Sequence, residues 1–204
     1  MDAASDRTLA CNWLAHDIGT IDGFLSPAEC AAYVQHGETL GYEEAPISTE
    51  RGAVIMKDVR NNDRVILDDP GRAEQLWRRV APFMPVRFQK KWRPVGVNER
   101  FRFYRYDVGQ QFDWHLDGYF ERANGERSFF TFMIYLNEDF EGGETSFSNH
   151  GSMVRAFDRF SVRPRTGTAL LFHHPVSHKG EPVMLGRKYV LRTDVMFARW
   201  LQAV

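Results

Sequence analysis

A histidine and an aspartate lie two positions apart in the stretch RYDVGQQFDWHLDG, which spans residues 105–118. On a β-strand, residues i and i+2 point to the same side, so His115 and Asp117 would offer an imidazole nitrogen and a carboxylate oxygen to one point in space. A non-haem Fe(II) site uses two histidines and one carboxylate on one face of the metal. The stretch thus contains two of three candidate ligands. The alternative interpretation is a histidine that caps a turn or pairs with its neighbour.

The third ligand has to come from another part of the chain. Four histidines follow Asp117 in the sequence: His150, His173, His174 and His178. Lys188 follows His178 by ten positions and begins a strand-like segment. A lysine buried among aromatic residues is costly unless it meets an anion, so Lys188 would suit the carboxylate of a bound cosubstrate.

The N-terminal half contains two predicted helices. A serine and a proline at residues 26–27, followed by Glu29, form a helix start, and the helix is expected to end at Gly41. A second helix is predicted from about residue 70 to the prolines that follow it. Between the helices, the polar residues 43–69 are interpreted as a hairpin or mobile flap, or as an ordinary surface excursion.

Residues 1–25 are expected to be a loose lead-in with a short strand near 18–24. From residue 100 onward the pattern is strand-like, and Gly, Asn, Asp and Pro separate the segments. The predicted strands are 101–108, 127–136, 145–148, 153–162, 168–173 and 188–197. Short strands in series without intervening helices indicate a sandwich or barrel. We therefore expect an α+β fold in which N-terminal helices pack on one sheet of a jelly roll.

The chain is long enough for one domain with a substantial core and too short for two. We expect a single domain over residues 1–204, with helical support in 1–99 and a jelly-roll catalytic core in 100–204. Within the first part, residues 43–65 are the candidate for a flap that closes over the site.

Five segments together carry a resemblance to a known family. They are RYDVGQQFDWHLDG (105–118), GERSFFTFMIYLN (125–137), FEGGETSFS (140–148), TGTALLF (166–172) and SHKGEPVMLGRKYVLRTDV (177–195). In these motifs the chain resembles the 2-oxoglutarate/Fe(II)-dependent oxygenases, specifically the prolyl 4-hydroxylase-like branch. The resemblance covers about half of the chain, and it implies a double-stranded β-helix with the metal at one mouth of the jelly roll.

The resemblance also implies roles for particular residues. His115, Asp117 and His178 would bind Fe(II), and Lys188 would bind the distal carboxylate of 2-oxoglutarate. The implied reaction uses O2 to hydroxylate a C–H bond while 2-oxoglutarate is decarboxylated to succinate, and ascorbate is a candidate reductant. Three protein ligands leave open positions on the metal for the cosubstrate and O2.

Further residues are candidates for the cosubstrate pocket. Tyr135 and Tyr106 occupy positions at which related hydroxylases place pocket tyrosines. Thr131 shares a predicted strand face with Tyr135 and is a third candidate. For both tyrosines, packing in the core with a hydrogen-bonded hydroxyl is the alternative.

The substrate candidates depart from the family pattern. Arg192 and Asp194 stand four and six positions after Lys188, where peptide-modifying prolyl hydroxylases tend to have a neutral residue and a tryptophan. They predict a polar or charged substrate group near the metal, or else an ion pair that braces the wall. Tyr119 and Arg122 follow the HxD motif and would line a substrate groove or form an ordinary loop. Peptidyl proline, another amino-acid side chain and a small metabolite all fit as substrates.

Composition excludes several other classes. A net charge of −1 gives no basic field for nucleic acid or an anionic membrane, and no apolar run reaches the length of a membrane span. With two cysteines and no visible secretory signal, a cytoplasmic location is expected. The alternatives are a zinc metallohydrolase with the same two histidines and aspartate, and a non-catalytic jelly-roll binding module. The sequence does not indicate an oligomeric state.

Overall fold

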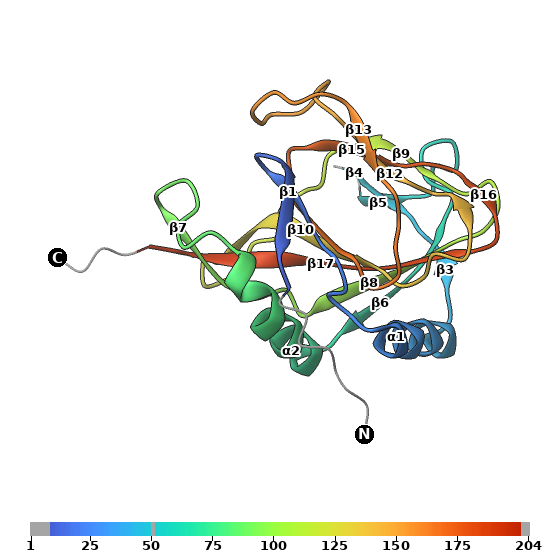
Figure 1. Cartoon of the computed structure of the whole chain (residues 1–204), viewed down its shortest axis with the longest axis horizontal. Coiled ribbons are helices and arrows are strands. Elements are labelled where there is room, and N and C mark those ends of the chain that lie inside the picture. The colour runs from blue at the N-terminus through green and yellow to red at the C-terminus, as the bar shows by residue number, and fades with distance from the viewer. Residues whose placement is uncertain (1–8, 50–51, 201–204) are drawn as a thin grey trace.

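Two β-sheets pack against each other in the computed structural model, and both helices lie on the outer side of the larger sheet (Figure 1). The structure describes residues 9–49 and 52–200. The helices are α1 (Pro27–Leu40) and α2 (Pro70–Val80), and the 3-10 turn η1 (Ala81–Phe83) follows α2. The strands are β1 (Cys11–Ala15), β2 (Ile18–Ile21), β3 (Glu43–Glu44), β4 (Ile47–Thr49), β5 (Gly52–Val54), β6 (Asp63–Asp68), β7 (Trp92–Val97), β8 (Arg100–Tyr106), β9 (Phe112–His115), β10 (Arg127–Tyr135), β11 (Glu141–Gly142), β12 (Thr145–Ser148), β13 (Phe160–Val162), β14 (Ala169–His173), β15 (Ser177–Gly180), β16 (Val183–Leu185) and β17 (Lys188–Arg199).

The strand order places neighbours in space that are far apart in sequence. The larger sheet runs β1-β2-β14-β10-β17-β8-β6-β3, and β7 also pairs with β17. The smaller sheet runs β13-β12-β15-β9. The strand pairs of both sheets are antiparallel. The predicted jelly roll, with N-terminal helices on one sheet, is confirmed by this arrangement.

Strand β8 shows how alternation divides the core into two parts. Phe101 and Phe103 point to one side and join the cluster that packs beneath the helices. Tyr104 and Tyr106 point to the other side and join the cluster between the two sheets. Successive side chains alternate across a strand, so the seven residues of β8 contribute side chains to both hydrophobic clusters. The side that faces the smaller sheet is the side on which a site can be built.

Helix α1 begins and ends as the sequence predicts. The Ser26 hydroxyl accepts a hydrogen bond from the Glu29 amide, and the Glu29 carboxylate accepts one from the Ser26 amide, which completes a capping box. Gly41 ends the helix with a φ of 84°, in the left-handed region that favours glycine. Helix α2 begins at Pro70 after the N-cap residue Asp69, and η1 with its proline ends it.

Several strands differ from the sequence prediction. The predicted strand 153–162 is wrong in its first part, because only Phe160–Val162 pairs, as β13. The expected loose lead-in contains β1, which pairs with β2. Strands β6 and β7 were not predicted, and both join the larger sheet. These strands form where tertiary partners are available, which local sequence patterns do not reveal.

The segment between the helices contains the predicted hairpin, because β4 pairs with β5. Residues 50–51 lie outside the described residues, and closure of the segment as a flap stays a prediction. The residues just after the hairpin are fixed to β9: the Asp113 amide donates to the Val59 carbonyl at 2.7 Å, and Arg60 bridges to Phe112. The segment is thereby connected to the strand that carries His115.

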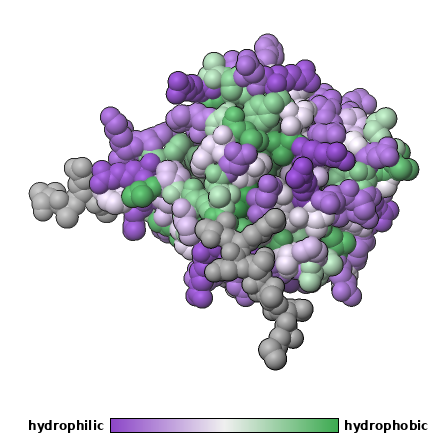
Figure 2. Space-filling model, in the orientation of Figure 1, coloured by the Kyte–Doolittle hydropathy of each residue, from purple (hydrophilic) through white to green (hydrophobic). Residues whose placement is uncertain are grey.

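Polar side chains form most of the outline in Figure 2, and apolar side chains gather near the upper middle of that face. A groove of about 690 Å³ lies on the surface between β1, η1 and residues 153–155. Its lining includes Trp13, Phe83 and His173. In the described part of the chain, no helix is long and apolar enough to cross a membrane.

Candidate metal and cosubstrate site

His115 and His178 lie directly opposite each other in the smaller sheet. His115 is the last residue of β9 and pairs with His178 of β15. Asp117 lies beyond the end of β9, and its carboxylate oxygens are 3.9 Å from Nε2 of His115 and 3.6 Å from Nε2 of His178. One ligand atom from each of the three residues lies within 4.8 Å of the others. The structure thus brings the three predicted ligands into a group that could hold a metal ion.

Backbone carbonyls orient both imidazoles. Nδ1 of His115 lies 2.7 Å from the Asp113 carbonyl oxygen, and Nδ1 of His178 lies 3.0 Å from the Val176 carbonyl oxygen. A carbonyl only accepts, so each Nδ1 carries the proton and donates it. In a neutral ring the Nε2 lone pair is then free and faces Asp117. Histidine ligands of metals are commonly oriented by such a hydrogen bond on the other ring nitrogen.

The protonation states suit metal binding. Burial and the nearby His178 hold the pKa of His115 well below 6.5, and burial likewise lowers the pKa of His178. Burial by itself would raise the pKa of Asp117, but Arg192 and the two histidines outweigh it and hold that pKa below 3.8. At neutral pH the group therefore presents two neutral imidazoles and one carboxylate, the forms in which these side chains ligate metals.

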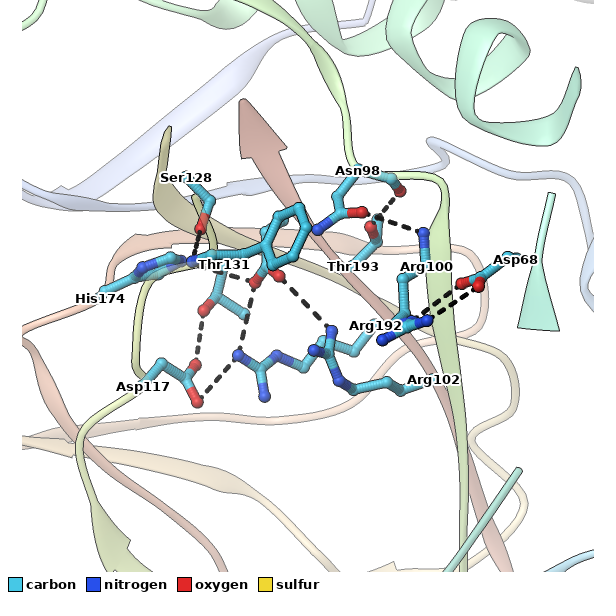
Figure 3. A network of polar contacts seen from close by, with 12 residues as sticks. Asp68, Asn98, Arg100, Arg102, Asp117, Ser128, Thr131, His174, Arg192 and Thr193 are labelled. Atoms are coloured by element: carbon cyan, nitrogen blue, oxygen red, sulfur yellow. Dashed lines mark hydrogen bonds and ion pairs between the residues drawn. The ribbon is translucent and has the colours of Figure 1, made fainter. Parts of the chain in front are cut away.

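Two side chains from the larger sheet hold Asp117 in place. The Thr131 hydroxyl of β10 donates a hydrogen bond to Asp117 Oδ2, and Nη2 of Arg192 on β17 lies 2.9 Å from Asp117 Oδ1 (Figure 3). Thr131 and Arg192 were predicted to touch the cosubstrate and the substrate, respectively. In the structure both contact a candidate metal ligand, and their predicted roles stay predictions.

Lys188 lies at the start of β17 and is 2% exposed. Its ammonium donates one hydrogen bond, 2.6 Å long, to the Gly143 carbonyl in the GGET turn. The Tyr106 and Tyr135 rings lie with their centroids 5.0 and 5.7 Å from Nζ. Burial lowers the pKa of Lys188 to about 8. An ammonium has three donors, so a buried one with a single carbonyl acceptor among the described residues is suited to a carboxylate.

The two predicted tyrosines surround this ammonium. The Tyr135 hydroxyl is buried and donates a hydrogen bond of 2.7 Å to Oγ1 of Thr145. Tyr106 is also buried and lines the same cavity as Lys188, Thr145 and the metal-ligand group. Their position beside Lys188 agrees with a cosubstrate pocket and also with the alternative of core packing.

The sequence model of the 2OG-Fe(II) oxygenase superfamily matches residues 101–195. This range contains the two histidines, the aspartate and Lys188, whose geometry is described above. Over this range, slightly less than half of the chain, the sequence is similar to the 2OG-Fe(II) oxygenase superfamily.

The chain is also similar to plant prolyl 4-hydroxylases. It is 27% identical over 192 residues to probable prolyl 4-hydroxylase 3 of Arabidopsis thaliana, an alignment covering 81% of this chain and 64% of the relative. It is 32% identical over 116 residues to probable prolyl 4-hydroxylase 9 of the same plant, covering 48% of this chain and 40% of the relative. The chain thus spans less than two thirds of the length of either relative.

Two solved structures share the fold of this chain. A viral collagen prolyl hydroxylase from Paramecium Bursaria Chlorella virus-1 matches with a TM-score of 0.62 and 21% identity, covering 89% of this chain and 97% of that one. A prolyl hydroxylase from Trichoplax adhaerens, in complex with a hypoxia inducible factor peptide fragment, matches with a TM-score of 0.65 and 16% identity, covering 89% and 84%. At these identities the likeness concerns the fold.

The cavity at the metal-ligand group contains aromatic residues that the sequence analysis did not predict. Tyr104 and Phe112 line it together with the metal-ligand group. The Phe112 ring stacks on His115 with 3.5 Å between centroids and 14° between planes. Strand parity could have found Tyr104, because it shares a face of β8 with Tyr106. No local signal marks Arg60, which lies over the Tyr104 and Phe112 rings at 4.7 and 4.4 Å.

The remaining substrate candidates lie in three different places. Asp194 is buried behind Arg192, 3.4 Å from its Nη2 and 3.5 Å from Nε2 of His174. Tyr119 is 61% exposed, and the guanidinium of Arg127 lies over its ring at 4.1 Å. Arg122 forms ion pairs with Glu99 and Glu126 and does not line the cavity at the metal-ligand group. A role in substrate binding stays a prediction for all three candidates.

Proposed function

We propose that this chain is an Fe(II)- and 2-oxoglutarate-dependent dioxygenase that hydroxylates a C–H bond of its substrate. One observation carries the proposal: two histidines, an aspartate and a buried lysine line a single cavity. The ammonium of this lysine donates one hydrogen bond to a described residue and has capacity for more. His115, Asp117 and His178 would hold the metal, and Lys188 would hold the distal carboxylate of 2-oxoglutarate. When bound, Fe(II) supplies O2 activation coupled to decarboxylation of 2-oxoglutarate to succinate.

The residues of the chain position these groups and exclude water. The Asp113 and Val176 carbonyls fix the two imidazoles, and Thr131 fixes the carboxylate of Asp117. The rings of Phe112 and Phe172 shield the histidines, since the Phe172 centroid lies 4.5 Å from that of His178. A dry, preorganised site of this kind strengthens electrostatic contacts and suppresses side reactions with solvent.

The zinc hydrolase alternative uses the same three ligands but assigns no role to Lys188. In the oxygenase the buried ammonium has a purpose, because its charge is compensated when the cosubstrate binds. We further propose O2 as co-reactant, ascorbate as the reductant that maintains activity, and a small-molecule or peptide substrate. The expected cytoplasmic location stays a prediction.

A succinate assay tests the proposal. Purified protein is incubated with Fe(II), ascorbate and 2-oxoglutarate in air, and succinate is measured with time. We expect slow succinate formation without added substrate, and its loss in His115→Ala. The matched control is His150→Ala, which removes an exposed histidine outside the metal-ligand group and should keep the activity of the unmodified protein.

The outcomes separate the candidate classes. No succinate from the unmodified protein, with zinc retained through purification, would favour the hydrolase. Equal succinate formation in both histidine variants would mean that the activity does not come from this site. Omission of ascorbate should shorten the active phase, and an unchanged time course would remove ascorbate from the scheme.

A further inference from the structure

Three neighbouring strands bring arginines to the sheet face that forms one wall of this cavity, and one of them, Arg192, lines the cavity itself. Arg192 of β17 lies directly opposite Arg102 of β8, and Arg64 of β6 lies directly opposite Tyr104, two positions from Arg102. In an antiparallel pair, directly opposed side chains lie on the same face, so Arg64, Arg102 and Arg192 share the face that lines the cavity. With Arg60, which lies over the ring of Tyr104, they form a group that we term the arginine cluster.

The arginine cluster has too few acidic partners. Asp194 is shared, at 3.4 Å from Arg102 and 3.4 Å from Arg192. The other acidic contact of Arg192 is Asp117, which is a candidate metal ligand. Like charges directly opposite each other in a sheet are destabilising, so the Arg102 and Arg192 pair requires compensation that one shared carboxylate supplies only in part.

The other two arginines of the cluster have no acidic partner among the residues that the structure describes. Arg60 is 5% exposed, bonds only the Asn62 amide oxygen, and keeps Nη2 buried without a hydrogen-bond partner. Arg64 is half-buried, and its cross-strand neighbour Glu43 forms no ion pair with it. A buried guanidinium with unused donors is costly, and an anion from outside the chain would remove that cost.

The electrostatic effect of the cluster is visible on Tyr104. Burial raises the pKa of this phenol, but Arg192, Arg60 and Arg102 outweigh burial and lower the pKa to about 8. For Arg64, burial and the same surrounding arginines lower the pKa of the guanidinium. Both directions indicate an excess of positive charge at this wall of the cavity.

Lys188 and the arginine cluster lie at different positions in the site. Arg192 stands four positions after Lys188 on β17, which corresponds to about 13 Å along a strand. The metal-ligand Asp117 lies beside Arg192, whereas Lys188 donates to the GGET turn. The carboxylate that Lys188 would hold therefore lies away from the cluster, which could accept a second anionic group.

We propose that the substrate of this protein carries an anionic group, a carboxylate by class, which binds in the arginine cluster while the C–H bond to be hydroxylated lies at the metal. The inference rests on the proposed oxygenase function and narrows its substrate class. An internal prolyl residue of a neutral peptide offers no such group. A free acid, or a peptide that presents a carboxylate at this position, does.

The test measures binding of a simple carboxylate without turnover. Protein loaded with diamagnetic Zn(II) and saturating 2-oxoglutarate is titrated with acetate or with the neutral analogue acetamide, at constant ionic strength. Binding is followed by NMR of the arginine side-chain N–H signals. We expect acetate, but not acetamide, to shift the signals of the cluster.

Substitutions locate the bound acetate. A hydrogen bond to a charged group is worth enough that Arg102→Gln and Arg64→Gln should each weaken acetate binding by about tenfold or more. Arg100→Gln is the matched control, because Arg100 shares the strand and face of Arg102 but is half-exposed and already paired with Asp68 at 2.9 Å. It should change the affinity by less than about twofold, since exposed pairs contribute little. Thermal unfolding verifies that each variant is folded.

The failures of the two proposals are distinguishable. Acetate bound only to the metal would bind equally to Arg102→Gln, Arg64→Gln and the unmodified protein, and that result would overturn the anion site. Equal shifts with acetate and acetamide, or no binding of either, would overturn it as well. None of these results depends on turnover, whereas absence of succinate in the assay above refutes the oxygenase function itself.

Discussion

The buried ammonium of Lys188 makes 2-oxoglutarate affinity depend on pH. The pKa of Lys188 is lowered to about 8 by burial, and a bound carboxylate would raise it again. Binding therefore takes up a proton once the pH exceeds the pKa of the free site. With a free-site pKa of about 8, the charged fraction falls about tenfold between pH 7 and pH 9, and we expect affinity to fall about tenfold with it.

Calorimetric titration of the Mn(II)-loaded protein with 2-oxoglutarate at pH 7, 8 and 9 measures this effect. In Lys188→Met the affinity at pH 7 should be about 10 to 100 times weaker, because a hydrogen bond to a charged group is lost. Its affinity should also be flat between pH 7 and 9. Lys91→Met, at an exposed position, is the matched control and should keep the pH dependence of the unmodified protein.

The same ammonium has the opposite effect on the cosubstrate-free protein. The folded-state pKa of about 8 lies below the ordinary 10.5, so the unfolded chain binds more protons between these values and stability rises with pH across that window. Below pH 8 the buried charge costs about 3 kcal/mol, and Lys188→Met should raise the free energy of unfolding at pH 7 by a similar amount. A pH-independent affinity in the unmodified protein, or a variant as pH-dependent as its parent, would refute this reasoning.

Three further perturbations follow from the structure. Thr131→Val removes the hydrogen bond to Asp117 and should weaken Mn(II) binding, measured by calorimetry, about 10- to 100-fold. An unchanged metal affinity would argue against a positioning role for Thr131. Burial lowers the pKa of His173 to about 4. Between pH 4 and the ordinary 6.5 the unfolded chain therefore binds more protons, and the free energy of unfolding decreases as the pH falls through that window. His173→Gln should reduce this decrease in urea titrations. Gly167→Ala should cost at least about 2 kcal/mol in the same titrations, because strain at positive φ adds to a clash. Gly167 has φ of 79°, and an added Cβ would lie 2.0 Å from the Leu25 carbonyl oxygen, so an unchanged midpoint would contradict the packing of this turn.

Local signals were sufficient wherever the controlling interaction is local. The capping box of Ser26 and Glu29 specifies the start of α1, since both hydrogen bonds join residues three apart. The HxD motif supplied His115 and Asp117 in the same way, although β9 ends at His115 and the pair meets at a strand end rather than within a strand. Resemblance in the C-terminal motifs identified His178 and Lys188.

Strand identity was less predictable where pairing partners are distant. Residues 153–157 have strand-like composition and do not pair, whereas β6 forms within a polar segment because β8 is available beside it. The propensity of a residue for a strand depends mostly on what packs against it, and a single sequence does not show those neighbours.

The sequence by itself determined the ligand types, the family motifs and the alternation that sends alternate side chains into the cavity. Only the tertiary structure decided that Arg60 and Arg64, from a segment with no recognisable motif, lie beside Arg102 and Arg192 near the metal-ligand group. The physical reason is the register of the strands. Backbone hydrogen bonds between distant segments, together with packing on both faces of the sheet, set which residues oppose each other. The order of residues within one strand does not.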